Sequence, residues 1–325
     1  MKILVTGGAG YIGSIVAEFL CDAGHHVIVI DDLSTGHRDA LEPRARFVEG
    51  SILDRETTLP VLSDGIDAVC HFAAFSLVAE SMEHPLKYYR NNIAGAVSLL
   101  GAMKEAGVGY FLFSSTAAVY GEPASVPITE NAPLNPVNAY GNTKLAVERL
   151  LADCHAAWGL KFLCLRYFNA AGASERFGED HHPETHLIPL VIDAACGKRP
   201  ELVVYGDDYP TLDGTCVRDY IHVKDLASAH LLGLDKLVRG LTGALNLGNG
   251  RGFSVREVVK AGEEVMGRKV PYRIGERRAG DPAVLFASSA KAEELLGWDR
   301  AYPDIEKIIR DAYEWRKRFP RGYGS

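Results

Sequence analysis

The start of the chain constrains its fold more than any other segment. A short apolar run, Lys2–Thr6, leads directly into Gly7, Gly10 and Gly13, and a helical pattern follows over Ile12–Ala23. Glycine permits the unusual φ of a tight turn and lets the backbone approach a pyrophosphate closely. Three spaced glycines among 33 could mark a plain turn. In the order strand, glycines, helix, they instead predict a dinucleotide site, with helix amides facing the phosphates.

Two carboxylates strengthen this prediction and select the cofactor. Asp31 and Asp32 follow the β-branched run His26–Ile30, and Asp31 lies eighteen residues after Gly13. A carboxylate at this offset accepts hydrogen bonds from a ribose 2′-hydroxyl and repels a 2′-phosphate. The nearest arginine that follows is Arg38, so the sequence favours NAD over NADP.

The pattern along the chain predicts an α/β fold. Runs typical of strands alternate with helical patterns in the first half, which indicates a doubly wound, Rossmann-type parallel sheet. We expect an NAD-binding domain over residues 1–170 and a smaller mixed α/β domain over 171–325, with some later segments returning to the first domain. The expected strands are Lys2–Thr6, His26–Ile30, Asp67–Phe72, Tyr110–Ser114 and Lys161–Arg166, and the expected helices are Ile12–Ala23, Leu86–Ala106, Val137–Trp158, Ile188–Cys196, Val223–Leu237, Ser254–Val265 and Asp304–Arg318.

Composition excludes several classes of partner. The net charge is −7, which argues against a nucleic-acid groove or a polybasic membrane surface. No apolar run reaches the roughly 18 residues of a membrane helix, and no signal peptide is recognisable. The six cysteines show no C-x-x-C pair, and we expect buried, reduced thiols in a cytoplasmic protein.

A tyrosine and a lysine at helical spacing are candidates for catalysis. Tyr140 and Lys144 lie four residues apart, so a helix places them on one face. A free tyrosine has a pKa of about 10 and is a poor base at neutral pH. A neighbouring ammonium and the positive ring of a nicotinamide would both favour the phenolate. Tyr140 could then take a proton from a sugar hydroxyl.

The same spacing occurs three times, at Tyr140–Lys144, Tyr220–Lys224 and Tyr313–Lys317. Only the first pair lies in the α/β half, after the strand that ends in Ser114 and Thr116. Side chains at the carboxyl end of a parallel strand face the crevice where ligands bind. We therefore group Thr116, Tyr140 and Lys144 as catalytic, the alternative being that Thr116 merely caps a turn.

Longer segments make a family resemblance specific. They include TGGAGYIGS at 6–14, DDLSTG at 31–36, FSSTAAVYGEP at 113–123, NAYGNTKLAVE at 138–148, LRYFNAAGA at 165–173, GEDHHPETHLIPL at 178–190, GTCVRDYIHVKDLA at 214–227 and RRAGDPA at 277–283. The chain resembles the UDP-glucose 4-epimerases, a family within the extended short-chain dehydrogenase/reductase superfamily, almost from end to end.

This resemblance implies an activity and two sets of contacts. The activity is NAD-dependent epimerisation at C4 of a UDP-hexose, which interconverts UDP-glucose and UDP-galactose through a transient 4-keto sugar. It also implies a homodimer built from helices of the α/β domain. The implied cofactor contacts are Gly7, Gly10, Tyr11, Ile12, Gly13, Asp31, Asp32, Leu33, Ser51, Ile52, Phe72, Ala73, Ala74, Asn91, Ser114, Tyr140, Lys144 and Tyr167. The implied UDP-sugar contacts are Thr116, Asn169, Leu187, Tyr205, Arg218, Arg278, Asp281 and Leu285.

Four positions depart from the family pattern, Ile15, Ser51, Ser76 and Leu285, and two of them affect what the site is expected to bind. Ser51 occupies a position where family members often carry an aspartate that binds the adenine, so the grip on the adenine is expected to be weaker. Leu285 stands where some members have a bulky tyrosine. The smaller side chain predicts room for an N-acetyl group, and hence activity on UDP-GlcNAc and UDP-GalNAc.

Other functions remain as alternatives. A sugar-nucleotide dehydratase needs an acid and a base after the threonine, where this chain has Ala117 and Ala118. A UDP-hexuronate 4-epimerase would share Tyr140 and Lys144, and a non-catalytic NAD sensor of the same fold would commonly lack one of them.

Three histidines, His181, His182 and His186, raise the question of a metal. Their spacing is loose and Pro183 follows the first two. We expect a loop near the substrate and no metal.

Overall fold

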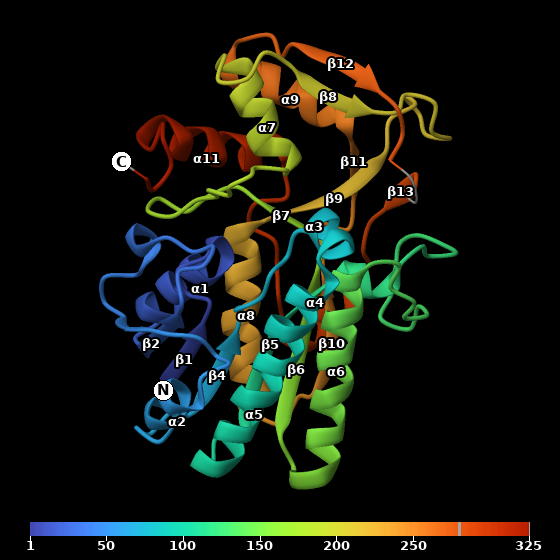
Figure 1. Cartoon of the computed structure of the whole chain (residues 1–325). Helices are drawn as coiled ribbons and strands as arrows, with labels where there is room; N and C mark the ends of the chain where they lie inside the picture. Colours follow the sequence, from blue (N-terminus) through green and yellow to red (C-terminus); the bar gives the residue numbers. More distant parts are fainter. Residues whose placement is uncertain (279–280, 325) are drawn as a thin grey trace.

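The computed structural model describes residues 1–278 and 281–324. A seven-stranded sheet with the order β10-β6-β5-β4-β1-β2-β3 forms its centre, and every neighbouring pair is parallel (Figure 1). The doubly wound Rossmann-type fold predicted from the alternating pattern is thereby confirmed. The strands are β1 (Lys2–Thr6), β2 (His26–Asp31), β3 (Arg46–Glu49), β4 (Ala68–His71), β5 (Tyr110–Thr116), β6 (Lys161–Tyr167) and β10 (Gly243–Leu247).

Helices cover both faces of this sheet and create two cores. Ile3 and Val5 of β1 belong to the core that includes α1 and α8, whereas Leu4 between them belongs to the core on the other face. This division follows from the two-residue period of a strand. The helices on the first face are α1 (Tyr11–Asp22) and α8 (Val223–Val238), and those on the second are α2 (Arg55–Leu62), α5 (Gly95–Ala106) and α6 (Ala139–Trp158).

A second lobe lies beyond the carboxyl ends of the large sheet (Figure 1). Its central strand β9 pairs with β7, β11 and β13, and β8 pairs separately with β12. Its strands are β7 (Asn169–Ala171), β8 (Leu202–Tyr205), β9 (Val217–His222), β11 (Gly252–Ser254), β12 (Tyr272–Gly275) and β13 (Val284–Leu285), and its helices are α7 (Leu187–Ala195), α9 (Val255–Met266) and α11 (Ile305–Arg318). The third core fills the space between α7, α9 and α11.

The expected helix Leu86–Ala106 is interrupted in the structure. It consists of α4 (Pro85–Tyr88), a π-helical turn η2 (Tyr89–Ala94) and α5, and the short α3 (Val78–Glu83) precedes it. The wide turn contains Asn92, whose amide accepts from the Phe75 backbone nitrogen and donates to the Phe75 carbonyl oxygen at 3.0 and 3.1 Å. A single turn of π-helix is a common way to present a side chain at a site. Here it fixes the segment that follows β4.

The last strand of the large sheet comes from the second half of the chain. β10 pairs with β6, and α8 packs against α1 and the sheet, so the segment 223–247 lies with the first lobe. Some later segments were expected to return to the first domain, but β10 was not among the predicted strands. The remaining short elements are η1 (Arg38–Ala40), η3 (Ala117–Tyr120) and α10 (Ala290–Leu296). Across residues 1–278 and 281–324, no helix combines the length and apolarity needed to cross a membrane.

Candidate active site

The glycine loop after β1 forms a cradle walled by backbone. Gly7 has φ +75°, and a Cβ atom built on it would lie 2.5 Å from the Ala73 backbone nitrogen. A Cβ on Gly13 would lie 2.1 Å from the Gly7 carbonyl oxygen. No other residue type fits these two positions without moving backbone. Because α1 begins at Tyr11, immediately after Gly10, its free N-terminal amides face the loop and suit a phosphate.

Asp31 braces this loop. One carboxylate oxygen accepts from the Ala9 backbone nitrogen at 3.0 Å and the other from the Leu33 backbone nitrogen at 2.9 Å. Leu33 has φ 56°, a left-handed conformation that is uncommon outside glycine. Burial raises the pKa of Asp31, and these two backbone hydrogen bonds oppose that rise. The neighbouring Asp32 is exposed, so the two predicted carboxylates differ: one organises the loop and the other faces the pocket mouth.

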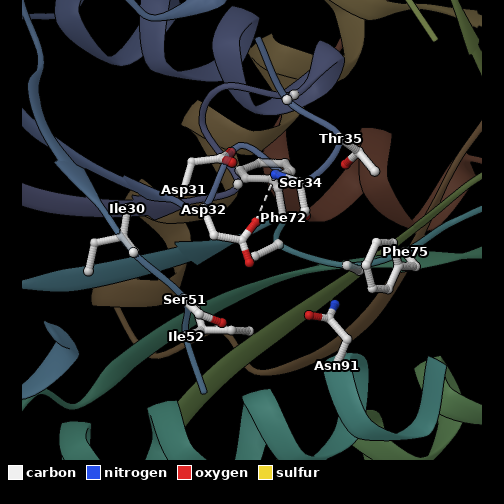
Figure 2. A pocket seen from close by; sticks show the side chains of 16 residues that line it. Ile30, Asp31, Asp32, Ser34, Thr35, Ser51, Ile52, Phe72, Phe75 and Asn91 are labelled. Carbon is white, nitrogen blue, oxygen red and sulfur yellow. Dashed lines mark hydrogen bonds between the residues drawn. The ribbon is translucent and has the colours of Figure 1, made fainter. Parts of the chain in front are cut away.

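A single pocket collects most of the predicted cofactor contacts (Figure 2). In Figure 2 the side chains of Asp31, Asp32, Ser34 and Thr35 lie above those of Ser51, Ile52 and Asn91. The predicted residues that line it are Gly7, Gly10, Asp31, Asp32, Ser51, Ile52, Phe72, Ala73, Ala74 and Asn91. Sequence reasoning missed Ile30, Ser34, Thr35, Gly36, Gly50 and Phe75, which also line it, although Ser34, Thr35 and Gly36 belong to the quoted segment DDLSTG.

Three predicted cofactor residues near the loop have no side chain in the pocket. The Tyr11 hydroxyl donates to the Gly172 carbonyl oxygen at 2.7 Å, which joins α1 to the chain entering the second lobe. Ile12 packs against the core between α1 and α8, and Gly13 acts by leaving space for Gly7. These residues shape the cradle without lining the pocket.

The predicted catalytic residues come together at the end of β5. Tyr140 and Lys144 lie one turn apart on α6, and the Thr116 hydroxyl lies next to the Tyr140 phenol. The Lys144 ammonium donates to the Ser114 carbonyl oxygen at 2.8 Å, and its nitrogen lies 5.9 Å from the centre of the Tyr140 ring. α6 begins at this point because the Asn138 side chain caps it by accepting from the Gly141 backbone nitrogen.

Burial sets the pKa values of Tyr140 and Lys144 in the protein alone. Burial raises the pKa of Tyr140 to about 12, and the neighbouring Thr116 hydroxyl opposes the rise only in part. Burial also lowers the pKa of Lys144 to about 7, against the attraction of Glu148. In the protein alone, Lys144 therefore does not bring the tyrosine into the neutral range. The further positive charge expected from the cofactor is needed for a phenolate.

A buried polar network lies beneath the catalytic group. Glu148, one turn after Lys144, accepts from the Ser115 hydroxyl at 2.5 Å and forms a two-point ion pair with Arg166 at 2.6 and 3.0 Å. Next to Arg166 on β6, the Tyr167 hydroxyl contacts the Ser114 hydroxyl. The network ties α6 to β5 and β6, and so fixes the strand ends that carry the predicted site.

The other two Tyr-Lys pairs have structural surroundings. Tyr220 lies on β9 rather than on a helix, and Lys224 pairs with Asp311 at 2.8 Å. On α11 the Lys317 ammonium lies 4.9 Å from the Tyr313 ring centre. The positional choice of Tyr140 thus agrees with where the three pairs lie.

The expected substrate residues form two groups on the second lobe. Arg218 of β9 lies in register with Leu285 of β13. The Arg218 guanidinium hydrogen-bonds the Asp281 carboxylate and donates to the Val217 carbonyl oxygen at 2.7 Å. Leu285 packs beside Tyr120 and its neighbours in a small fourth core.

The remaining substrate candidates are more exposed. The Arg278 guanidinium lies 4.0 Å from the centre of the exposed Tyr205 ring, a stacked cation–π pair. Asn169 uses its side-chain amide to donate to the Asp219 carbonyl oxygen at 2.8 Å. Leu187 is the first residue of α7, so its amide is one of the free donors at that helix end.

Comparison with known proteins agrees with this geometry. Residues 3–248 match the model of the NAD dependent epimerase/dehydratase family. The chain belongs to this family. The match includes the glycine cradle, the Asp31 brace and the catalytic group.

Relatives within this family match the whole chain. A UDP-glucose 4-epimerase of Lacticaseibacillus casei is 52% identical over 329 residues, covering 100% of this chain and 99% of the relative. The crystal structure of UDP-glucose 4-epimerase from Brucella ovis in complex with NAD is 48% identical, with a TM-score of 0.94 over 97% of this chain and 98% of the other. The Bifidobacterium longum enzyme in complex with NAD+ and UDP is 39% identical, with a TM-score of 0.95 over 99% and 100%.

Proposed function

We propose that this protein is an NAD-dependent 4-epimerase of UDP-hexoses that interconverts UDP-glucose and UDP-galactose. The observation that carries the proposal is the group Thr116, Tyr140 and Lys144 at the carboxyl end of β5. The full-length similarity to UDP-glucose 4-epimerases supports it.

The proposed cofactor is NAD, held by the glycine cradle and the pocket beside it. The backbone around Gly7 and Gly13 leaves no space for a side chain on the loop, and bare backbone allows a pyrophosphate to approach closely. The exposed Asp32 and the buried Asp31 offer carboxylates to a ribose and disfavour a 2′-phosphate. NAD, when bound there, supplies the reversible hydride acceptor that epimerisation at C4 requires.

In the proposed mechanism, Tyr140 moves the proton of the sugar 4-hydroxyl. Its phenolate accepts that proton as hydride leaves C4, and its phenol returns the proton when hydride comes back to the other face of the 4-keto sugar. Thr116, whose hydroxyl lies next to the phenol, is placed to contact the same sugar oxygen. Lys144 adds positive charge on the same helix face and is held by the Ser114 carbonyl oxygen.

The proposed UDP-sugar site lies on the facing lobe. Guanidinium groups suit a diphosphate because they donate paired hydrogen bonds, and Arg218 and Arg278 supply two of them. The proposed UDP-sugar contacts are completed by Asn169, Leu187, Tyr205 and Asp281. Leu285 is smaller than a tyrosine, which supports additional activity on UDP-GlcNAc and UDP-GalNAc. If active enzyme does not turn over UDP-GlcNAc, this additional activity is refuted.

The two alternative functions are less well supported. The relatives named above are UDP-glucose 4-epimerases, which does not favour a UDP-hexuronate enzyme. A non-catalytic sensor would have no use for a tyrosine placed next to a threonine hydroxyl and one helical turn from a buried lysine.

We further propose that the protein acts as a homodimer. Large apolar side chains are exposed on α3, α4, η2 and α5, which lie near one another in Figure 1. They are Val78, Met82, Leu86, Tyr89 and Val97, and Leu86 is 83% exposed. Such a group of apolar side chains is typical of a protein–protein contact.

A cytoplasmic location is proposed from the free cysteines, which suit a reducing compartment. The division of the chain at residue 170 is proposed as its domain boundary, with 223–247 assigned to the first domain.

The direct experiment is to incubate purified protein with UDP-galactose, without added cofactor, and to measure UDP-glucose. We expect product, because NAD should remain bound through purification and is regenerated in each cycle. Product that appears only after NAD is added would indicate weak retention, with Ser51 as the first residue to change. No product from UDP-galactose or UDP-glucose with saturating NAD would contradict the proposal.

A further inference from the structure

The segment that enters α7 assembles four metal-ligating side chains outside the catalytic group. They are Glu179, His181, Glu184 and His186, and one ligand atom from each lies within 4.8 Å of all the others. Glu179 is buried and His186 is exposed, so the group has a closed end and an open end. We propose that these four residues form a binding site for one Zn²⁺ ion.

The spacing of the ligand atoms suits a small tetrahedral ion. Tetrahedral Zn²⁺ with bonds of about 2.0–2.2 Å holds neighbouring ligand atoms roughly 3.3–3.6 Å apart. The Nδ1 atom of His181 lies 3.2 Å from a Glu179 oxygen, and the Nδ1 atom of His186 lies 3.8 Å from a Glu184 oxygen. The His186–Glu179 contact is closer still, and these two side chains would have to move apart to admit the ion.

An ion pair between Glu179 and His186 does not account for the whole group. The Nδ1 atom of His181 is buried and makes no hydrogen bond with any residue that the structure describes. It faces Glu179 in a geometry too poor for a hydrogen bond, although the two atoms are close. A buried nitrogen without a partner is costly unless something binds it. A metal ion at the centre of the four residues would satisfy it.

The ligand set also matches zinc in kind. Two imidazoles and two carboxylates give nitrogen and oxygen donors, which zinc binds readily, and their summed charge of −2 with neutral imidazoles balances a divalent ion. The proposed ligands are already oriented by their surroundings, as in many metal sites. One Glu184 oxygen accepts from the Thr185 and His186 backbone nitrogens at 2.8 and 2.9 Å, and the other accepts from Arg316 at 3.4 Å.

The position of the site points to a structural role. The His181 ring packs edge-on against Tyr11 of α1, with the ring centres 6.3 Å apart, and His186 immediately precedes α7. Zn²⁺ would therefore fasten the start of α7 to the segment that crosses the start of α1. The histidines alone predict no metal, because their spacing along the sequence is loose. The two glutamates that complete the set become visible only in the fold.

The histidine next to the site provides a matched control. His182 has a side chain that is 75% exposed, and it contacts Asp180 rather than the group of four. Replacing it with alanine removes an imidazole from the same segment without removing a proposed ligand. The informative variants are His181→Ala and Glu184→Gln, because neither removes the most buried carboxylate. Far-UV circular dichroism and the amount of retained NAD would show that each variant folds.

The experiment is a titration of tag-free, chelator-treated full-length protein with Zn²⁺ against a chromophoric competitor. We expect one saturable Zn²⁺ per chain in wild type and in His182→Ala, and an affinity at least about a hundredfold lower in His181→Ala and Glu184→Gln. Added Zn²⁺ should raise the Tm of wild type and His182→Ala only. No stoichiometric binding, or equal affinity in all four proteins, would overturn the proposal. Neither readout depends on epimerase turnover.

Discussion

Backbone atoms form much of the wall of the cofactor pocket, whereas side chains form the face expected to hold the sugar nucleotide. In the glycine cradle beside this pocket, Gly7 and Gly13 touch other backbone at distances that leave no room for a Cβ atom. On the facing lobe, Arg218 hydrogen-bonds Asp281 and Arg278 stacks on Tyr205. The first region is therefore formed before its ligand arrives, while in the second the arginines would exchange protein partners for phosphate oxygens if they bind the diphosphate as proposed.

This difference suits a reaction in which one ligand stays and the other turns over. A preformed site loses little conformational freedom on binding and can retain its ligand. A site whose charges are already paired binds less tightly, because each new hydrogen bond replaces an existing one. We expect tight NAD and exchangeable UDP-sugar, and four substitutions test that expectation.

The largest effect is expected from Tyr140→Phe, at the junction of the two regions. Loss of the phenol removes the proposed proton acceptor, so turnover should fall by about 10³-fold or more. Ring packing is unchanged, and the NAD content after gel filtration should match that of wild type. The measurements are kcat with UDP-galactose and bound NAD per chain. Retention of a tenth of wild-type activity would exclude Tyr140 as the base.

Gly13→Ala should damage the preformed region selectively. The added Cβ would lie 2.1 Å from the Gly7 carbonyl oxygen, so the loop must shift. This shift should lower the free energy of unfolding by about 1–3 kcal/mol. We expect the retained NAD to fall at least tenfold, with a lower Tm.

Gly109→Ala is the control for that substitution, because a Cβ atom at Gly109 meets nothing within 4 Å. If both variants kept a full complement of NAD, the tight contact around Gly7 would not be what forms the cofactor cradle.

Arg218→Met should affect only the second region. Loss of a charged hydrogen-bond donor to the diphosphate is worth about 1.5–3 kcal/mol, which corresponds to a roughly 10- to 100-fold weaker Kd for UDP. The NAD content should not change. Arg239→Met is the control, because Arg239 pairs with Asp235 on the surface, far along the chain from β9. A parallel loss of NAD would show that the two regions are coupled rather than separate.

The smallest effect is expected from Ser51→Asp, a substitution within the cofactor pocket. Ser51 lines the pocket, and its hydroxyl accepts weakly from the Leu53 backbone nitrogen at 3.3 Å. A carboxylate is a stronger acceptor for an adenine amino group, so NAD should dissociate about threefold to tenfold more slowly. Stopped-flow displacement would measure the rate. Faster dissociation would mean that added negative charge beside Asp31 and Asp32 outweighs the new hydrogen bond.

Much of the fold and the first region could be predicted from the sequence because local rules determine them. The order strand, glycines, helix and the offset to Asp31 are properties of a single βαβ unit. The choice of Tyr140 among three identical spacings required only the rule that ligands lie at the carboxyl ends of parallel strands. The structure places Tyr140 beside Thr116, as that rule predicts.

The parts that could not be predicted depend on contacts between distant segments. Nothing in the run Leu86–Ala106 shows that Asn92 will bond the Phe75 backbone and widen the helix by a π turn. The tyrosine pKa is expected to be lowered by Lys144 together with a bound nicotinamide. In the protein alone, burial raises the pKa of Tyr140 and lowers that of Lys144. Burial is a property of the whole fold, and a short motif does not contain it.

The pairing of β10 with β6 has a consequence for how the protein is made. During synthesis, the strands up to β6 emerge from the ribosome before residues 243–247 exist. Until then, β6 is an open edge with unpaired backbone donors and acceptors, which invites association with other nascent chains. A fragment that stops at residue 170 would keep that edge permanently. The large sheet is completed only after about three quarters of the chain has emerged, so truncated products of this protein should be prone to aggregate.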